Sequence, residues 1–213
     1  MNTGRTRVKI CGITRAEDAV AAARAGADAI GLVFHPDSPR YVTPEQALQI
    51  LQAVPPLVTV VGLFMDAEAG EVNEVLATVP VDLLQFHGSE TAALCRSFRR
   101  GYIKAVPMGG DSDGFTATFA KDYPDARGFV VDSHAPGAAG GSGKRFDWQR
   151  LDARPARPLI LAGGLTPDNV AAAVLEVKPW AVDVSSGVES SPGRKDIALM
   201  QRFVQGVYGG LDD

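Results

Sequence analysis

The chain has 213 residues, of which 46% are hydrophobic, and this length and composition are typical of one α/β domain that buries a large core. Its net charge is -4 and its acidic and basic residues are interspersed, so it offers no basic surface for a nucleic acid. The two cysteines, Cys11 and Cys95, are too few for a disulfide framework and lack the paired spacing of a zinc site.

The sequence begins with a polar stretch, residues 1–7, that leads directly into an apolar run. We find no signal-peptide pattern and no apolar segment of membrane-spanning length in it. We therefore expect a cytoplasmic protein with no membrane partner. Residues 1–6 are expected to form a flexible N-terminal extension.

Eight short runs rich in Val, Ile and Leu recur along the chain, each followed by a turn and a helical pattern. This alternation is typical of a parallel sheet whose strands are joined by helices. The predicted strands are Val8–Ile13, Ala29–Phe34, Val58–Phe64, Leu83–Gly88, Tyr102–Met108, Gly128–Ser133, Pro158–Gly163 and Ala181–Ser186.

Helical patterns follow the strands. The predicted helices are Arg15–Ala25, Glu45–Ala53, Ala67–Thr78, Glu90–Arg99, Gly114–Lys121, Phe146–Leu151, Asp168–Val177 and Arg194–Gly206. Residues that are typical of helix starts precede five of these helices: Thr14, Thr43, Asp66, Ser89 and Thr166. Thr43 and Thr166 are predicted N-caps because each precedes a proline, which needs no backbone hydrogen bond in the first turn of a helix.

Eight parallel strands with right-handed helical crossovers predict a single (β/α)8 barrel, the TIM-barrel fold, over residues 1–213. Ligands of such barrels bind at the carboxyl ends of the strands. The alternative is an open doubly wound sheet, but the first βα turn lacks the Gly-x-Gly-x-x-Gly pattern that would favour it.

Reactive residue types stand where the strands end. They are Cys11, Gln85, His87, Asp132, Gly163, Gly164, Ser185, Ser186 and Gly187. Each of them alone is weak evidence. Because one face of a barrel would bring them together, their joint placement predicts a functional site at that face.

Cys11 and Asp132 are the two groups suited to proton transfer. A free cysteine is usually a small buried hydrophobe, and we interpret Cys95 in this way, but a strand end followed by Gly12 favours a reactive role for Cys11. Asp132 ends an apolar run, so desolvation should raise its pKa and suit it to donate a proton. The alternative for Asp132 is a turn-capping role, although the long glycine-containing loop from Ser133 is more typical of an active-site loop.

Strand alternation predicts a buried ion pair. If Cys11 points into the barrel mouth, Lys9 points into the barrel beneath it, and Asp183 lies on the last strand, which neighbours the first in a closed barrel. A lysine inside a barrel requires an opposite charge, so we expect a Lys9–Asp183 pair. The alternative is that Lys9 faces the helices and reaches solvent.

Two glycine-containing loops are candidates for phosphate binding. Gly163 and Gly164 follow the seventh strand, and Ser185, Ser186 and Gly187 follow the eighth. Glycines allow the backbone to approach a ligand, and exposed N–H groups and serine hydroxyls donate to phosphate oxygens. Two ordinary glycine turns are the alternative.

Several motifs together resemble those of the phosphoribosylanthranilate isomerase family, in order from about Arg7 to the final helix. They are Lys9-Ile-Cys-Gly-Ile-Thr14, Gly31-Leu-Val-Phe34, Ser38-Pro-Arg-Tyr41, Leu84-Gln-Phe-His-Gly88, Asp132 with Gly140-Gly-Ser-Gly-Lys-Arg-Phe-Asp-Trp148, Leu161-Ala-Gly-Gly-Leu165 and Val182-Asp-Val-Ser-Ser-Gly-Val-Glu189. Phe86 departs from the aliphatic residue expected there, but strand alternation turns it away from the barrel mouth.

The resemblance implies an intramolecular oxidoreductase that performs a cofactor-free and metal-free Amadori rearrangement of N-(5'-phosphoribosyl)anthranilate in tryptophan biosynthesis. Asp132 would be the general acid and Cys11 the general base. Arg40 would hold the anthranilate carboxylate, and Gln85, His87 and Asp183 would contact the substrate. The expected partner is this small phosphorylated molecule, and the expected assembly is a monomer or a homodimer.

Two other functions fit parts of the pattern. The isomerase of histidine biosynthesis performs the same type of rearrangement, but that family uses two aspartates and here the first strand ends in Cys11. A catalytically inactive barrel that binds a phosphorylated ligand would have no reason to keep both a thiol and a carboxylic acid at its mouth.

Overall fold

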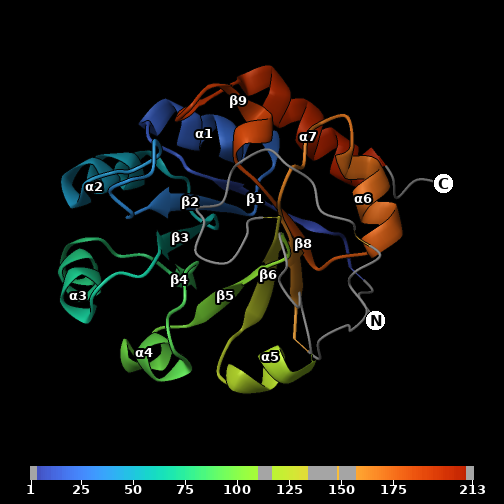
Figure 1. Ribbon diagram of the computed structural model, residues 1–213. Helices are drawn as coiled ribbons and strands as arrows, with labels where there is room; N and C mark the ends of the chain where they lie inside the picture. The colour runs from blue at the N-terminus through green and yellow to red at the C-terminus, as the bar shows by residue number, and fades with distance from the viewer. Residues whose placement is uncertain (1–3, 110–116, 134–147, 149–156, 210–213) are drawn as a thin grey trace.

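The computed structural model describes residues 4–109, 117–133, 148 and 157–209. Eight strands pair in parallel in the order β1 to β8, and β8 closes the barrel against β1 (Figure 1). The strands are β1 (Arg7–Cys11), β2 (Ala29–Val33), β3 (Thr59–Phe64), β4 (Leu83–Phe86), β5 (Tyr102–Pro107), β6 (Gly128–Asp132), β7 (Leu159–Leu161) and β8 (Ala181–Val184). The predicted (β/α)8 barrel is confirmed.

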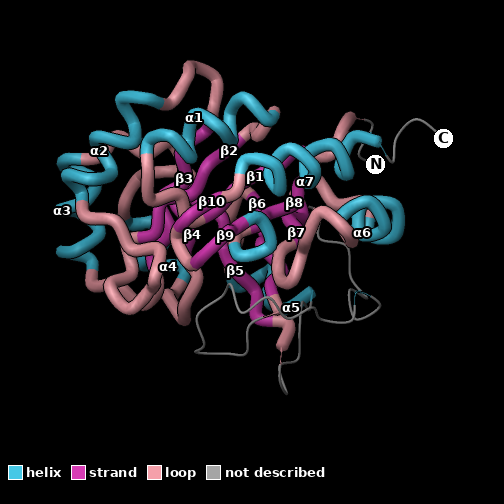
Figure 2. Tube along the Cα trace, turned by 90° about the horizontal axis from the view of Figure 1, so that it is seen from above, coloured by secondary structure: helices cyan, strands magenta, loops and turns pink. Residues whose placement is uncertain are grey.

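The helices surround the strands, as the view from above shows (Figure 2). They are α1 (Ala16–Ala25), α2 (Pro44–Ala53), α3 (Ala69–Thr78), α4 (Ala92–Ser97), α5 (Ala117–Asp122), α6 (Val170–Val177) and α7 (Ile197–Gly209). The first part of the predicted helix Gly114–Lys121 and all of Phe146–Leu151 except Trp148 lie outside the described residues. No helix in the described ranges has the length and apolar character needed to cross a membrane.

The chain after β8 differs from the prediction. A short 3-10 helix, η2 (Ser186–Val188), leads into an antiparallel hairpin of β9 (Glu189–Ser191) and β10 (Arg194–Lys195). Only then does α7 begin, at Ile197, so the predicted start of the last helix at Arg194 is wrong. Several strands were also predicted to end later in the sequence than they do. The chain leaves the hydrogen-bonded ladder before it turns over the barrel rim.

The two predicted N-caps have different outcomes. Thr43 caps α2 in a reciprocal capping box with Gln46, as its position before a proline predicts. Thr166 does not cap α6, which begins at Val170 after Asn169. Instead the Thr166 backbone N–H donates to Asn169 Oδ1 at 2.8 Å, so these residues form a turn before the helix.

The other predicted start residues also lie outside the caps. Arg15, Glu68 and Thr91 stand at the N-caps of α1, α3 and α4, rather than Thr14, Asp66 and Ser89. Asp66 Oδ1 instead accepts hydrogen bonds from the backbone and the hydroxyl of Ser89, each at 2.7 Å. Polar side chains that resemble caps in the sequence therefore join neighbouring loops at the barrel mouth.

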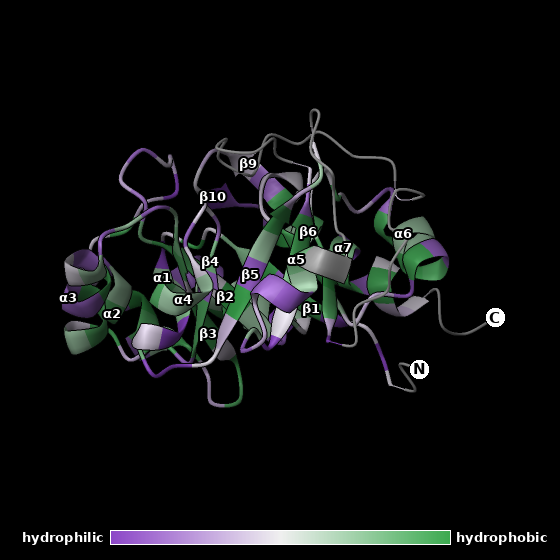
Figure 3. Ribbon diagram, turned by 60° about the horizontal axis from the view of Figure 1, so that its bottom comes forward, coloured by the Kyte–Doolittle hydropathy of each residue, from purple (hydrophilic) through white to green (hydrophobic). Residues whose placement is uncertain are grey.

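Two apolar layers hold the barrel, and they appear in green along the strands and the helix faces in Figure 3. The outer layer lies between strands and helices and includes Val8, Ile10 and Cys95, which is fully buried as predicted. The inner layer fills the barrel and includes Val61, Ile103, Ala105, Val130, Ile160, Ala162 and Ala181. Phe86 lies in the outer layer, stacked on Phe98, which confirms that it points away from the mouth.

An ion pair is buried in the outer layer below the end of β4. The Lys104 ammonium lies 3.3 Å from Glu90 Oε2 and also donates to the carbonyl oxygens of Phe86 and Gly88. Glu90 Oε1 accepts from the backbone N–H groups of Asp66 and Gly88. The pair thus holds the loop after β4, which carries a predicted site residue, against the rest of the barrel.

We predict that Lys104→Met lowers the free energy of unfolding by about 3–5 kcal/mol, because it leaves the Glu90 carboxylate buried without a counter-charge. Urea denaturation followed by circular dichroism measures the change. The double variant Lys104→Met/Glu90→Gln should regain part of the loss, since its buried acid is neutral. Equal stability of wild type and Lys104→Met would show that the pair does not hold this layer.

Candidate active site

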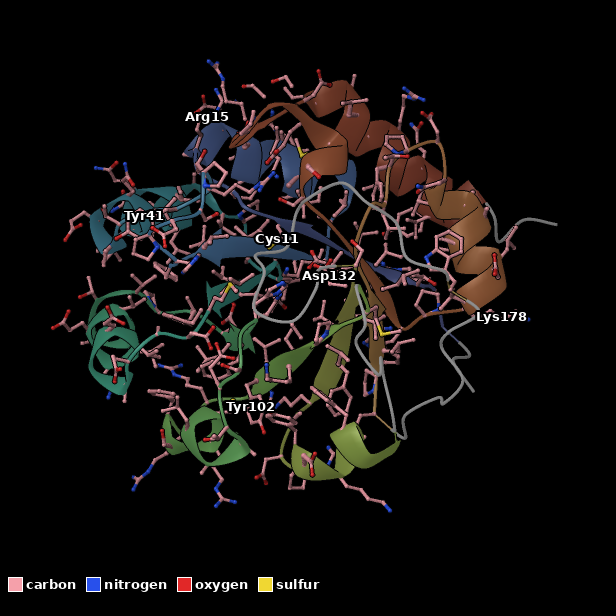
Figure 4. The ribbon with its side chains drawn as sticks, viewed as in Figure 1. Cys11, Arg15, Tyr41, Tyr102, Asp132 and Lys178 are labelled. Carbon is pink, nitrogen blue, oxygen red and sulfur yellow. The ribbon has the colours of Figure 1, made fainter. Side chains whose placement is uncertain are left out.

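A cavity opens at the carboxyl ends of the barrel strands. Every residue predicted for the site lines it. These residues are Cys11, Arg40, Gln85, His87, Asp132, Gly163, Gly164, Asp183, Ser185, Ser186 and Gly187. Figure 4 shows Cys11 and Asp132 at the centre of the ring of strands, whereas Arg15, Tyr41 and Lys178 lie farther out, near the surrounding helices. Of the loop predicted from Ser133 to Lys144, all residues after Ser133 lie outside the described residues.

Cys11 ends β1 with its side chain facing the cavity among Val33 and Leu63. Glycines on both sides make this position possible. A Cβ atom on Gly31 of β2 would lie 2.6 Å from Cys11 Sγ, so only glycine leaves room for the sulfur. Gly12 follows with φ 74°, a left-handed conformation that turns the chain out of the strand directly after the thiol.

The ion pair predicted beneath the thiol is confirmed. Lys9 Nζ lies 2.7 Å from Asp183 Oδ2, and both side chains are buried inside the barrel. The β1–β8 register places Lys9 directly opposite Asp183. Asp183 also lines the cavity, and its Oδ1 accepts no hydrogen bond within the described part of the chain.

Electrostatics around Cys11 combine burial with a nearby cation. Burial raises the pKa of the Cys11 thiol above its ordinary value, and the Lys9 ammonium opposes this rise. Burial alone would lower the pKa of the Lys9 amine, but the Asp183 carboxylate and Cys11 together outweigh burial and hold that pKa above its usual range. Lys9 is therefore a permanent positive charge beneath the sulfur.

Asp132 lies across the cavity at the end of β6 and is buried. His87 Nε2 is 3.7 Å from Asp132 Oδ2, and the other ring nitrogen, Nδ1, lies 3.1 Å from Gln85 Nε2. An amide nitrogen only donates, so Nδ1 accepts and the ring proton of neutral His87 is on Nε2, facing the carboxyl group. Gln85 thereby orients His87 toward Asp132.

The loops after β7 and β8 meet at the same rim. Gly163 and Gly164 have φ 81° and 65°, so the backbone after β7 turns in a way that side-chain-bearing residues rarely adopt. A Cβ atom on Gly187 would lie 1.9 Å from the carbonyl oxygen of Leu165. Glycine at this position therefore allows the two loops to pack against each other beside the cavity.

Arg40 is not a solvated loop arginine, because only 9% of it is exposed. Its Nε and Nη2 each donate to one carboxylate oxygen of Glu189 at 2.8 Å. Lys195 Nζ donates to the same carboxylate at 2.8 Å. Glu189 was predicted only as part of a motif and Lys195 only as part of a helix, so neither was predicted as a member of the site. The antiparallel hairpin that pairs them was the missing signal.

No group of three or more His, Cys, Asp or Glu side chains in the described ranges has a geometry that could hold a metal ion.

We predict that Lys9→Met raises the pKa of Cys11 further, because it removes the cation that opposes the effect of burial. The measurement is the rate of iodoacetamide alkylation against pH, since the thiolate is the reactive form. A Cys95→Ser background leaves Cys11 as the only thiol. The midpoint should move to higher pH in Lys9→Met and stay in place in Lys9→Arg, and an unmoved midpoint in both would exclude this role of Lys9.

The fold and the site together define the class of protein. It is an enzyme built on a (β/α)8 barrel, with its reactive groups at the carboxyl ends of the strands. A family model described as N-(5'-phosphoribosyl)anthranilate (PRA) isomerase matches residues 8–206. The chain therefore belongs to the N-(5'-phosphoribosyl)anthranilate isomerase family, and it is an aldose-ketose isomerase of tryptophan biosynthesis.

Relatives and solved structures agree with this assignment. The N-(5'-phosphoribosyl)anthranilate isomerase of Pseudomonas aeruginosa strain UCBPP-PA14 is 55% identical over 203 residues, which cover 94% of each chain. The crystal structure of phosphoribosyl anthranilate isomerase from Thermotoga maritima has a TM-score of 0.82 at 41% identity, covering 96% of this chain and 99% of that one. A phosphoribosyl anthranilate isomerase in complex with reduced 1-(o-carboxyphenylamino)-1-deoxyribulose 5-phosphate has a TM-score of 0.79 at 38% identity, with the same coverage.

Proposed function

We propose that this chain converts N-(5'-phosphoribosyl)anthranilate to 1-(o-carboxyphenylamino)-1-deoxyribulose 5-phosphate, with Asp132 as general acid and Cys11 as general base. One observation carries the proposal: a thiol and a carboxyl group, on β1 and β6, both line one cavity at the barrel mouth. The relative solved with the reduced product supports the choice of ligand.

Ring opening is the first step. Protonated Asp132 donates its proton to the ribose ring oxygen, and the bond between this oxygen and C1' breaks. The lone pair of the anthranilate nitrogen forms the C1'–N double bond of an iminium ion. Asp132 is then a carboxylate beside His87 Nε2–H, which is placed to stabilise the new negative charge.

Proton abstraction is the second step. The Cys11 thiolate removes the C2' proton, and the electrons of that bond form a C1'–C2' double bond while the iminium electrons return to nitrogen. The resulting enolamine tautomerises to the ketone as the O2' proton leaves and C1' gains one. Because the iminium acidifies the C2' proton, the reaction requires neither a metal nor a cofactor.

The remaining site residues would bind the substrate. Arg40 is proposed to hold the anthranilate carboxylate, which suits a planar donor with several N–H groups. Gln85, His87 and Asp183 are proposed to contact the sugar. The phosphate is proposed to bind the backbone N–H groups and hydroxyls of Gly163, Gly164, Ser185, Ser186 and Gly187.

The whole chain, residues 1–213, is proposed to act as one catalytic domain, as a monomer or a homodimer in the cytoplasm. Closure of β8 on β1 supports a single domain, because strands from both ends of the chain are needed to complete the barrel. Both cysteines are free, which is consistent with a reducing compartment. Light scattering of the purified protein decides between monomer and homodimer.

We predict that Cys11→Ser and Asp132→Asn each lower kcat by about 10²-fold or more, because each removes one proton-transfer group. The assay follows the loss of anthranilate fluorescence with freshly generated substrate. Cys95→Ser, which changes the buried thiol outside the cavity, is the matched control and should keep wild-type activity. Wild-type activity in both Cys11→Ser and Asp132→Asn would exclude this mechanism.

A further inference from the structure

A cluster of three charged side chains is buried at the edge of the cavity. It consists of Arg40, Glu189 and Lys195, whose side chains are 11%, 5% and 0% exposed. Both cations contact the same carboxylate, so the cluster carries two positive charges and one negative charge. A site built from these groups has one unit of positive charge left over.

Glu189 keeps its negative charge in this setting. Burial alone would raise the pKa of the Glu189 carboxyl, but the hydrogen bond from Arg40 and the charge of Lys195 outweigh burial and hold the pKa below its usual range. Asp18, Cys11 and Asp183 are the other titratable groups near the cluster. Asp18 is already paired with Arg15, and Asp183 is already paired with Lys9. Because each of these two carboxylates has a cation of its own, neither cancels the excess positive charge of the cluster.

Glu189 fixes the orientation of the Arg40 guanidinium. The two hydrogen bonds occupy Nε and one N–H of Nη2, and Nη1 donates to none of the described residues. The edge formed by Nη1 and Nη2 thus remains for a ligand in the cavity that Arg40 lines. The stem of Arg40 passes over Gly12, where a Cβ atom would lie 2.4 Å from Arg40 Cδ, so this edge has a set position relative to Cys11.

The hairpin after η2 holds the other two charges in place. Glu189 of β9 and Lys195 of β10 are register partners. The Lys195 backbone N–H donates to Asp18 Oδ2 at 3.2 Å, which ties the hairpin to α1. Lys195 Nζ also donates to the carbonyl oxygen of Ser185 at 3.1 Å.

We propose that Glu189 and Lys195 are positioning residues for the carboxylate of the substrate: Glu189 orients Arg40, and Lys195 supplies the charge that keeps the cluster positive. This inference rests on the proposed function, in which Arg40 binds that carboxylate. An Arg40–Glu189 pair alone would be neutral. With Lys195, the arriving carboxylate completes a balanced set of two cations and two anions, which is the arrangement that a buried site favours.

The test compares two substrates. One is N-(5'-phosphoribosyl)anthranilate, and the other is N-(5'-phosphoribosyl)aniline, which has the same phosphate and sugar but no carboxylate. Lys195→Gln should raise KM for the first by about 10-fold, because it removes one positive charge close to the edge of Arg40 that binds the carboxylate, and leave KM for the second nearly unchanged. Lys195→Arg, which keeps the charge, should restore discrimination between them.

The double variant Lys195→Gln/Glu189→Gln separates charge from structure. It returns the cluster to one net positive charge, so it should regain part of the carboxylate affinity that Lys195→Gln loses, whereas a purely structural role predicts a further loss. If Lys195→Gln does not fold, the double variant should still have a KM nearer to wild type than to Arg40→Met, because its Arg40 guanidinium is free to pair with the carboxylate of the substrate.

Two other outcomes are decisive. An equal rise in KM for both substrates in Lys195→Gln would overturn the inference, because it would show that Lys195 acts through Ser185 and the phosphate loop or through the fold. If Arg40→Met discriminates between the two substrates as wild type does, the assignment of Arg40 in the proposed function fails. If Arg40→Met loses discrimination and Lys195→Gln keeps it, only the further inference fails.

Discussion

The ion pair between Lys9 and Asp183 is the constraint on which the rest of the site depends. Closure of β8 on β1 sets these two residues opposite each other, and neither charge would be tolerated inside the barrel without the other. The pair thus joins the ends of the barrel at the position where the thiol requires a cation beneath it. One contact therefore serves both the fold and the chemistry of Cys11.

The buried charges at the barrel mouth, above the Lys9–Asp183 pair, are also paired with opposite charges. Arg40 is buried only because Glu189 pairs with it, and Glu189 in turn contacts Lys195. The acid side of the cavity is arranged differently, with neutral His87 oriented by Gln85 toward Asp132. Base and acid thus lie in distinct surroundings, cationic near Cys11 and hydrogen-bonding near Asp132, which suits two different proton transfers.

Much of this arrangement could be predicted from the sequence, and the failures have physical causes. Period-two alternation on β1 placed Lys9 inside the barrel and Val8 and Ile10 outside, because a strand offers only two faces. The hairpin was missed because β9 and β10 are too short to show the alternation of apolar and polar residues that marks a strand. The residues next to Lys195 in the sequence also do not indicate that it is buried. Thr166 resembled an N-cap, but a turn precedes α6 and Asn169 occupies that position.

A crystal structure of this chain with reduced 1-(o-carboxyphenylamino)-1-deoxyribulose 5-phosphate tests the central claim most directly. The account predicts that Cys11 Sγ contacts the ligand at C2', that the Asp132 carboxyl contacts the oxygen derived from the ribose ring, and that the phosphate lies against the loops after β7 and β8. A ligand seated in the cavity with neither the sulfur nor the carboxyl group in contact with it would contradict the account.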